Sequence, residues 1–161
     1  VSDITYVATD EGWLYLAGIK DLFNGELVGY AMSERMTTSL VSQALFRAVA
    51  AKRPAKGLVH HSDRGSQHCS LAYRKQLQQF GMQASMSRKG NCWDNAPMES
   101  FWGSLKNELV HHRHFATRTQ AGQEITEYIE IFYNRIRKQA RLGYRSPAQF
   151  AQQYHAKQIA A

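Results

Sequence analysis

The first third of the chain restricts the possible folds more than any other segment. Short runs of β-branched and aromatic residues alternate there with turn signals, among them Asn24-Gly25, a pair typical of tight β-hairpins. The pattern predicts three consecutive antiparallel strands, at residues 2–8, 13–19 and 27–32. A chain that begins in this way does not form an all-helical domain.

The spacing of the apolar residues changes after Thr37. From Leu40 to Val49 they recur at helical intervals, and Pro54 predicts the end of this helix. Residues 57–61 form a short apolar run, which predicts a β-α-β crossover and a parallel neighbour. The elements expected after it are a loop at 62–70, a helix at 71–80, a strand at about 82–86, a polar loop at 87–95, a helix opened by Asn95 and Pro97, and a long helix at about 120–138.

This order of elements predicts an α/β fold. We expect a five-stranded mixed sheet with helices on both faces, which is the ribonuclease H-like arrangement. The 161 residues are 43% hydrophobic and 20% charged, a composition that fits one compact domain. The last long helix is expected to turn one apolar face to the core, made of Ile125, Tyr128, Ile129, Phe132, Tyr133 and Ile136.

The charge of the chain is basic and unevenly distributed. Lys and Arg number 20 against 13 Asp and Glu, which gives a net charge of +7 and an isoelectric point near 9.6. Residues 1–62 hold six basic and six acidic side chains, whereas residues 63–161 hold fourteen and seven. This excess in the second part of the chain indicates a polyanionic partner.

The number of cysteines and the length of the apolar runs indicate the cellular compartment. Cys69 and Cys92 are too few for a disulfide framework. The first residues lack the pattern of a secretion signal, and no apolar run approaches the ~20 residues that cross a bilayer. We therefore expect a cytoplasmic protein with no membrane partner. Because the chain starts inside a strand-like run, we also expect it to be a fragment of a longer protein.

Three acidic residues are candidates for a shared site. Asp3 lies on the first predicted strand, Asp63 just beyond the fourth, and Glu99 in the first turn of the helix opened by Asn95. The first and fourth strands can be neighbours in a mixed sheet, and a packed helix would bring Glu99 from the side. Mg²⁺ prefers oxygen ligands, and a two-metal site for phosphodiester chemistry needs carboxylates that converge. Between Asp63 and Glu99 lie 35 residues.

Several motifs around these carboxylates resemble the integrase core of bacterial insertion-sequence transposases of the OrfB type. This family is related to the retroviral integrases and belongs to the DDE superfamily, whose signature is Asp, Asp, a 35-residue gap and Glu. The motifs are His60-His61-Ser62-Asp63-Arg64-Gly65-Ser66-Gln67, Ser85-Met86-Ser87-Arg88-Lys89-Gly90-Asn91, Asp94-Asn95-Ala96 and Glu99-Ser100-Phe101, with Asp3-Ile4-Thr5-Tyr6 upstream and Tyr133-Asn134, Leu142-Gly143-Tyr144 and Ser146-Pro147 downstream. They cover nearly the whole chain in the right order.

The resemblance implies an enzyme. It implies that Asp3, Asp63 and Glu99 are catalytic and hold two Mg²⁺ ions, which Mn²⁺ can replace. The implied reaction is metal-dependent cleavage of DNA at transposon ends and transfer of the freed 3′-OH to target DNA, by in-line displacements without a covalent enzyme intermediate. The implied partners are double-stranded DNA, as transposon ends and as target, and further copies of the chain in a homo-oligomeric complex. Such a protein would be bacterial and nucleoid-associated.

The family pattern also implies boundaries and shows departures. We expect the integrase catalytic core to span 1–161, with a ribonuclease H-like core to about residue 118 and a C-terminal helical extension at 119–161, and the family's N-terminal DNA-recognition region to be absent. Three residues differ from the pattern. His68 stands where Tyr is common, Trp102 where Phe is common, and Gln139 where His is common. None of the three is expected to contact the carboxylates.

Five basic residues are expected to contact DNA. Lys106 follows Glu99 by seven positions and so lies on the same helix face, although it can also be an ordinary surface lysine. Arg88 and Lys89 lie in the polar loop, which resembles the mobile active-site loop of integrases. Arg64 follows Asp63 directly. Arg137 belongs to the basic group near the C-terminus, which can track DNA or form a solvated helix face.

Alternative functions are also consistent with parts of this pattern. A ribonuclease H-like nuclease or a resolvase would share the fold and the metals but stop at hydrolysis, and an inactive DNA-binding or assembly fragment would lack the chemistry. His61-Ser62-Asp63-Arg64 also matches the H-x-x-R run of tyrosine recombinases, but the strands argue against their all-helical domain. A zinc site is not supported by the spacing of His60, His61, His68, Cys69 and Cys92.

Overall fold

One mixed sheet organises the molecule. The computed structural model describes residues 1–87 and 95–160. The strands run in the order β3-β2-β1-β4-β5, with β1 at Ser2–Thr9, β2 at Gly12–Lys20, β3 at Leu27–Ser33, β4 at Val59–Ser62 and β5 at Gln83–Met86. β1, β2 and β3 are antiparallel neighbours, whereas β4 pairs in parallel with β1 and β5 in parallel with β4. The predicted five-stranded mixed sheet is confirmed.

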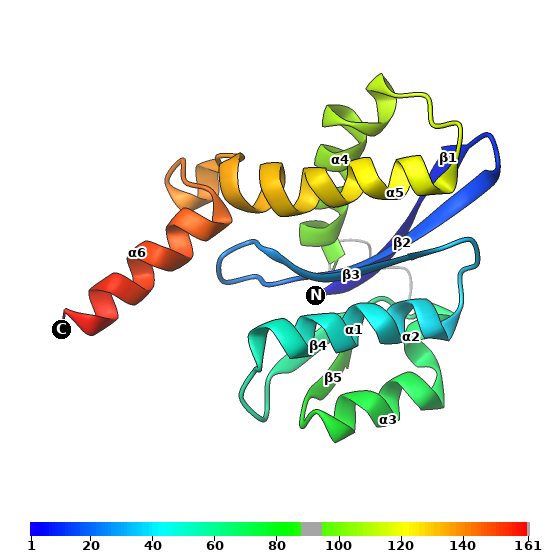
Figure 1. The fold of residues 1–161 in the computed structure, drawn as a ribbon. Coiled ribbons are helices and arrows are strands. Elements are labelled where there is room, and N and C mark those ends of the chain that lie inside the picture. Colours follow the sequence, from blue (N-terminus) through cyan, green and yellow to red (C-terminus); the bar gives the residue numbers. More distant parts are fainter. Residues whose placement is uncertain (88–94, 161) are drawn as a thin grey trace.

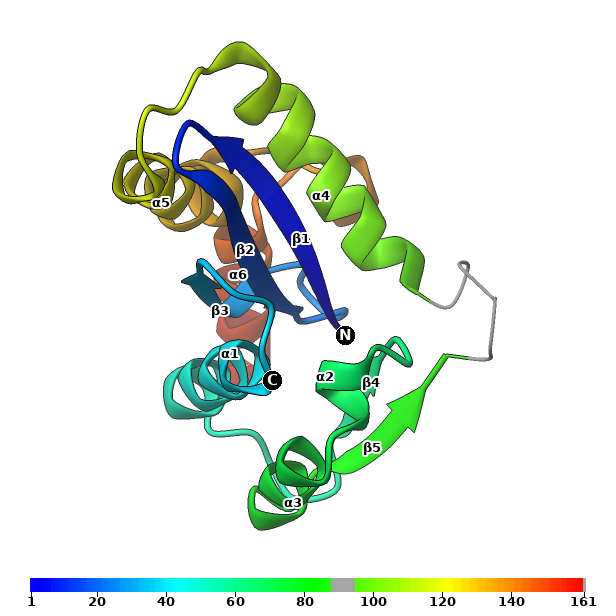
Figure 2. The same cartoon turned by 90° about the vertical axis from the view of Figure 1, so that its right-hand side faces the viewer.

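Helices cover both faces of the sheet (Figure 1, Figure 2). α1 (Thr38–Lys52) and α3 (Leu71–Gln79) lie on one face, and α4 (Ala96–Glu108) and α5 (Arg118–Glu127) lie on the other. Side chains alternate along β2, so Ala17 packs with Leu45 of α1 while Leu16 packs with Phe101 of α4 and Ile125 of α5. The predicted layers are therefore confirmed, each with its own apolar core.

Short helical segments fall where a loop or a connection was expected. α2 (Ser66–Cys69) lies inside the predicted loop, and 3-10 turns follow α4 at η2 (Val110–His112) and precede the last helix at η4 (Ala140–Leu142). Segments of three or four residues are too short to carry an apolar period, so the sequence pattern gave no signal for them.

The long helix near the C-terminus changes its geometry after Glu127. The segment η3 (Tyr128–Ile136) is a π-helix, whose bonds reach five residues along the chain and widen each turn. This wider turn buries Tyr133 and Asn134 in succession, while Phe132 and Ile136 are 40% and 58% exposed. The prediction that Phe132 and Ile136 share the buried face was wrong, because it assumed 3.6 residues per turn.

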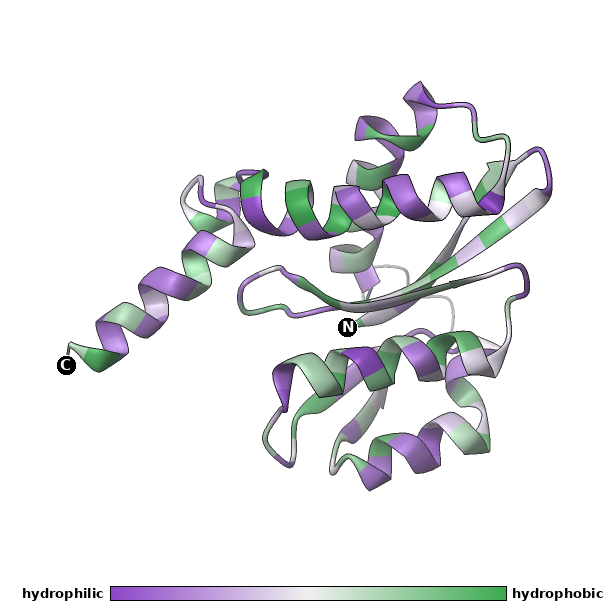
Figure 3. Cartoon of the chain, in the orientation of Figure 1, coloured by the Kyte–Doolittle hydropathy of each residue, from purple (hydrophilic) through white to green (hydrophobic). Residues whose placement is uncertain are grey.

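α6 (Pro147–Ile159) extends beyond the sheet at the C-terminus (Figure 1). Ser146 and Gln149 form a reciprocal capping box at its start. The helix contacts the β2–β3 loop, where the Phe23 ring lies 5.5 Å from that of Phe150 and 4.8 Å from that of Tyr154. Hydrophilic and hydrophobic residues alternate along α6 (Figure 3). Among the helices that the structure describes, none has the length and apolar character to cross a membrane.

Candidate active site

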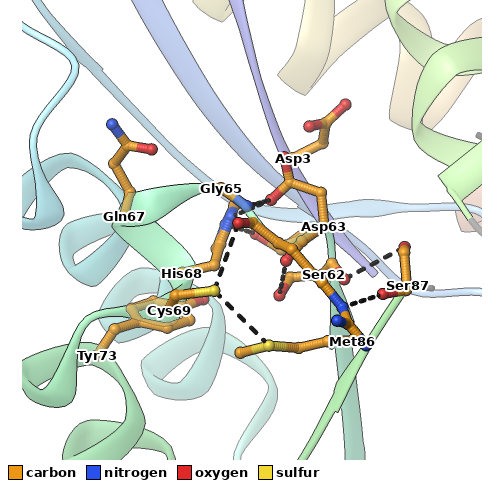
Figure 4. A network of polar contacts seen from close by, with 12 residues as sticks. Asp3, Ser62, Asp63, Gly65, Gln67, His68, Cys69, Tyr73, Met86 and Ser87 are labelled. Carbon is orange, nitrogen blue, oxygen red and sulfur yellow. Dashed lines mark hydrogen bonds and ion pairs between the residues drawn. The ribbon is translucent and has the colours of Figure 1, made fainter. Parts of the chain in front are cut away.

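The parallel pairing of β1 and β4 places Asp3 next to Asp63. Ser2 is in register with Ser62, so the two residues that follow occupy neighbouring positions of the sheet. Both side chains appear in the polar network of Figure 4. Burial raises the pKa of Asp3 above its ordinary value, and the nearby charge of Asp63 adds to this shift. The expectation that the first and fourth strands bring these carboxylates together is confirmed.

Asp3 is held by a residue of the helix that crosses the sheet. The indole Nε1 of Trp102 in α4 donates to Oδ2 of Asp3 over 3.0 Å. The ring has room because Gly18 is the residue paired with Asp3 on β2, and a Cβ at Gly18 would lie 2.9 Å from the Trp102 ring. The small residue on β2 thus allows α4 to approach and orient the carboxylate.

Asp63 is held by the short helix that follows it. Nδ1 of His68 lies 2.8 Å from Oδ1 of Asp63, and the Gly65 amide donates to the same oxygen over 3.0 Å. Because a carboxylate only accepts, the hydrogen lies on Nδ1, and Nε2 on the other side of the ring is hydrogen-bonded to the Ser2 hydroxyl 3.0 Å away. The bond from His68 holds the pKa of Asp63 below its usual range. His68, 1% exposed, therefore links β1 to Asp63 (Figure 4).

Glu99 lies in the first turn of α4, as predicted, and is exposed. It precedes Trp102 by three positions, so both side chains leave the same side of the helix. Within residues 1–87 and 95–160, no three His, Cys, Asp or Glu side chains are close enough together to hold a metal ion. The structure brings Asp3 and Asp63 together and leaves Glu99 one helical turn from the residue that contacts Asp3.

The chemistry of these side chains fits a hard divalent cation. Asp3 and Asp63 offer carboxylate oxygens, the ligand type that Mg²⁺ and Mn²⁺ prefer. The pKa of Asp3 is raised mainly by burial, and repulsion between the two neighbouring carboxylates adds a smaller part. A cation between them would remove this repulsion. His68 and Trp102 donate to single oxygens of these groups and leave the others open to a ligand.

The basic residues expected to contact DNA have different surroundings. The Lys106 ammonium lies 5.4 Å from the centre of the Tyr6 ring, and Nε of Arg64 donates to the Ser87 carbonyl over 2.6 Å. Arg137 forms an ion pair with Glu108 at 2.7 Å. Arg88 and Lys89 lie outside the described residues. Arg137 is thus committed to a protein carboxylate, whereas Arg64 is exposed and Lys106 is half-buried.

The sequence reasoning missed the residues that orient the carboxylates. His68 and Trp102 were expected to contact neither Asp3 nor Asp63, and the structure shows that this was wrong for both. For Trp102, the expectation overlooked that a buried indole N–H usually finds an acceptor. Both residues depart from the family pattern. This departure was the sequence signal that could have singled them out as partners of the carboxylates. Gln139, the third departure, lies elsewhere, beside η4.

Comparisons with known proteins agree with this geometry. Two models described as integrase core domain match residues 1–92 and 99–154. A 31 kDa protein of insertion element IS600 from Shigella sonnei is 61% identical over 96% of this chain and 57% of its own length. The transposase of IS904 from Lactococcus lactis is 48% identical, over 93% of this chain and 59% of that protein. Transposase InsF of IS3A from Escherichia coli is 45% identical, over 92% and 51%.

The chain therefore spans somewhat more than half the length of these relatives. Solved structures share its fold at low sequence identity. The catalytic core of BIV integrase has a TM-score of 0.65 at 14% identity, over 97% of this chain and 96% of that one. The HTLV-2 integrase core in complex with magnesium has a TM-score of 0.66 at 13% identity, over 92% of each chain. The chain belongs to the integrase core domain family.

Proposed function

We propose that this chain is the catalytic domain of a DDE transposase, which cleaves DNA at transposon ends and transfers the 3′-OH to target DNA. The observation that carries the proposal is the pairing of Asp3 and Asp63 at adjacent strands, each held by a donor from another element. Ordinary surface carboxylates have no need of hydrogen-bond donors that orient them from two separate elements. Relatives at 45–48% identity are named transposases, which supports the same reaction class.

The proposed roles follow from these positions. Asp3 and Asp63 would hold a pair of Mg²⁺ ions, with Mn²⁺ as a substitute, and Glu99 would complete the set from α4. When bound, the metal would polarise the phosphate and lower the pKa of the attacking water. Trp102 fixes the direction of the Asp3 carboxylate, and His68 with the Gly65 amide fixes that of Asp63. Arg64 and Lys106 are the described cations placed to contact DNA phosphates near them.

The proposed reaction has two steps, cleavage and strand transfer. In cleavage, the oxygen of water bonds to phosphorus while the bond to the 3′ oxygen breaks, and that oxygen leaves as a 3′-OH. In transfer, the 3′-OH bonds to a target phosphorus and displaces the 3′ oxygen of the target strand. Both steps are in-line displacements at phosphorus, so one site can serve both. The DNA ends and the target would be assembled by several copies of the chain, as the intasome among its structural neighbours suggests for its own integrase.

A Y-shaped DNA substrate tests this proposal without requiring recognition of transposon ends. It presents a 3′-OH beside the phosphodiester at the branch, so the reverse of transfer joins the two target arms. We expect Mn²⁺-dependent joining by the wild type, and a loss of roughly 1,000-fold or more in Asp63→Asn and in Glu99→Gln. DNA binding should stay within about twofold, because neither change removes a cation.

The matched control is Glu127→Gln, an exposed carboxylate on α5. It should retain the wild-type rate. Branch hydrolysis without joining would favour the ribonuclease H-like nuclease, and DNA binding without either reaction would favour the inactive assembly fragment. Joining retained in Glu99→Gln would overturn the assignment of the third carboxylate.

A further inference from the structure

A basic cavity lies beside the first turns of α4. Its volume is about 550 Å³, and it is bounded by α4, the end of η3 and the segment 138–141. Four cations line it, Lys20, Arg137, Lys138 and Arg141, together with the hydroxyl-bearing Ser100 and Ser104 of α4. None of the described residues that line it is acidic. We call this space the Lys20 cavity.

Lys20 is an unusual residue for the end of a buried strand. It is 5% exposed, and its ammonium donates to the Pro97 carbonyl in the first turn of α4 over 3.1 Å. The ammonium also lies 6.0 Å and 5.7 Å from the centres of the Phe101 and Tyr133 rings. No carboxylate of the described part of the chain forms an ion pair with it. A buried ammonium without an anionic partner is costly, so a functional use is expected.

The neighbouring cations increase this cost. Burial, together with the smaller effects of the Arg141 and Arg137 charges, lowers the pKa of Lys20 to about 8. Arg137 is paired with Glu108, whereas the Arg141 guanidinium, among the residues that the structure describes, donates to a neutral group, the Leu22 carbonyl, over 3.3 Å. The cavity thus carries positive charge that the surrounding protein does not neutralise. An anion bound there would restore the charge balance and favour the protonated form of Lys20.

The cavity lies close to the carboxylate site. Gly18 pairs with Asp3, and Lys20 is two residues further along β2, so its side chain leaves the same face of the sheet as Asp3. Two residues of a strand span roughly 7 Å. A DNA strand carries one phosphate for every ~3.4 Å of helix axis, so a strand that passes Asp3 brings neighbouring phosphates within reach of Lys20.

We propose that the Lys20 cavity holds a backbone phosphate of DNA, close along the same strand to the phosphodiester presented to Asp3 and Asp63. This inference rests on the proposed transposase function, because it takes the strand to run past these carboxylates. The phosphate would accept from the Lys20 ammonium and the Arg141 guanidinium, with the Ser100 hydroxyl as a further donor. Free phosphate offers the same chemistry, and the experiment separates the two.

The test measures duplex DNA binding in EDTA, by fluorescence anisotropy over a series of salt concentrations. Loss of one phosphate contact should reduce the slope of log affinity against log salt by about 0.9. We expect this in Lys20→Met, which keeps the length and packing of the side chain, and in Arg141→Met, which changes an exposed residue and cannot harm the core. The control is Lys75→Met, an exposed lysine on α3 across the sheet, and it removes the same charge.

A second arm uses inorganic phosphate as the probe. Phosphate should raise the melting temperature of the wild type and compete with DNA, and both effects should be lost in Lys20→Met. Equal slopes in the wild type, Lys20→Met and Arg141→Met would overturn the proposal. Binding of inorganic phosphate with unchanged DNA slopes would also overturn it and would indicate a site for a free anion.

The two proposals fail separately. The binding assay contains no metal and no reaction, whereas the Y-shaped substrate reports on the reaction. A slope that depends on Lys20, in a wild type that joins no DNA, would refute the transposase function and retain the phosphate site. Joining of DNA by the wild type, with a salt slope that is the same in Lys20→Met, would support the transposase function and refute the phosphate site.

Discussion

At the scale of single residues, the pKa values of Asp3 and Asp63 depend on the surroundings of each carboxylate. Asp3 and Asp63 have opposite pKa shifts, raised and lowered respectively, although they are neighbours. Burial dominates for Asp3, while the bond from His68 dominates for Asp63. The order of ionisation is therefore set by the burial of Asp3 and by the His68 bond to Asp63, while the Trp102 bond partly offsets the burial of Asp3.

Trp102→Phe tests the role of the indole. The change keeps an aromatic ring at the residue type common in the family, but removes the hydrogen bond to Asp3. The pKa of Asp3 should rise further, and the affinity for Mn²⁺ should fall by roughly 10-fold, the usual effect of removing an outer partner of a metal ligand. Carbon NMR titration of the Asp3 carboxyl and calorimetry with Mn²⁺ measure these effects.

The matched control for this substitution is Trp13→Phe, at a half-exposed indole on β2. It should change neither quantity. An Asp3 pKa that is the same in Trp102→Phe and in the wild type would show that the indole bond has no influence on the carboxylate.

At the scale of elements, β4 is tied to α3 by a buried polar pair. His60 of β4 is 4% exposed and bonds to the hydroxyl of Tyr73, 2.9 Å away. Burial lowers the pKa of His60 to about 3. The folded protein therefore binds fewer protons at His60 than the unfolded chain does below pH 6.5, and folding becomes less favourable as the pH falls.

This linkage predicts an acid-sensitive sheet. Between pH 7 and 4.5 the wild type should lose about 2–3 kcal/mol of unfolding free energy through His60. His60→Phe cannot be protonated and should lack this part of the pH dependence, measured by urea unfolding at a series of pH values. His155→Phe, at an exposed histidine of α6, is the control. Identical pH profiles for the wild type and His60→Phe would contradict the prediction.

The helices also show which features the spacing of apolar residues predicts and which it does not. The apolar period and the end signals identified α1 and α3 within about two residues of their observed bounds, and Asn95 with Pro97 located the start of α4. It failed at η3, where Phe132 and Ile136 are exposed, because the π-helical turn is selected by packing against the sheet. A sequence period assumes a constant helix geometry and cannot report such a change.

At the scale of the whole molecule, the side-chain amide of Asn134 bonds the C-terminal helical region to the edge of the sheet. The side chain of Asn134 accepts from the Leu27 amide over 3.0 Å and donates to the Leu27 carbonyl over 3.1 Å. Leu27 begins β3, the edge strand, so Asn134 satisfies backbone groups that no further strand pairs with. Tyr133, next to it, lies in the same apolar core as Leu27.

Asn134→Ala should destabilise the protein strongly. It would leave a buried N–H and C=O of Leu27 without partners, at a cost of roughly 2–4 kcal/mol of unfolding free energy. Asn107→Ala, at an exposed asparagine of α4, should cost less than about 0.5 kcal/mol. Urea unfolding of both variants decides between these values, and a loss below 1 kcal/mol in Asn134→Ala would contradict the proposed tie.

The sequence alone determined the order of strands and helices, the position of Asp3, Asp63 and Glu99 on them, and the excess of positive charge. These are properties of neighbours in the chain, which periods, turn residues and spacings report directly. The tertiary structure decided which groups hold the carboxylates and where the charge is buried. Trp102 meets Asp3 across 99 residues and Lys20 meets Pro97 across 77, and only the packing of α4 on the sheet brings them together.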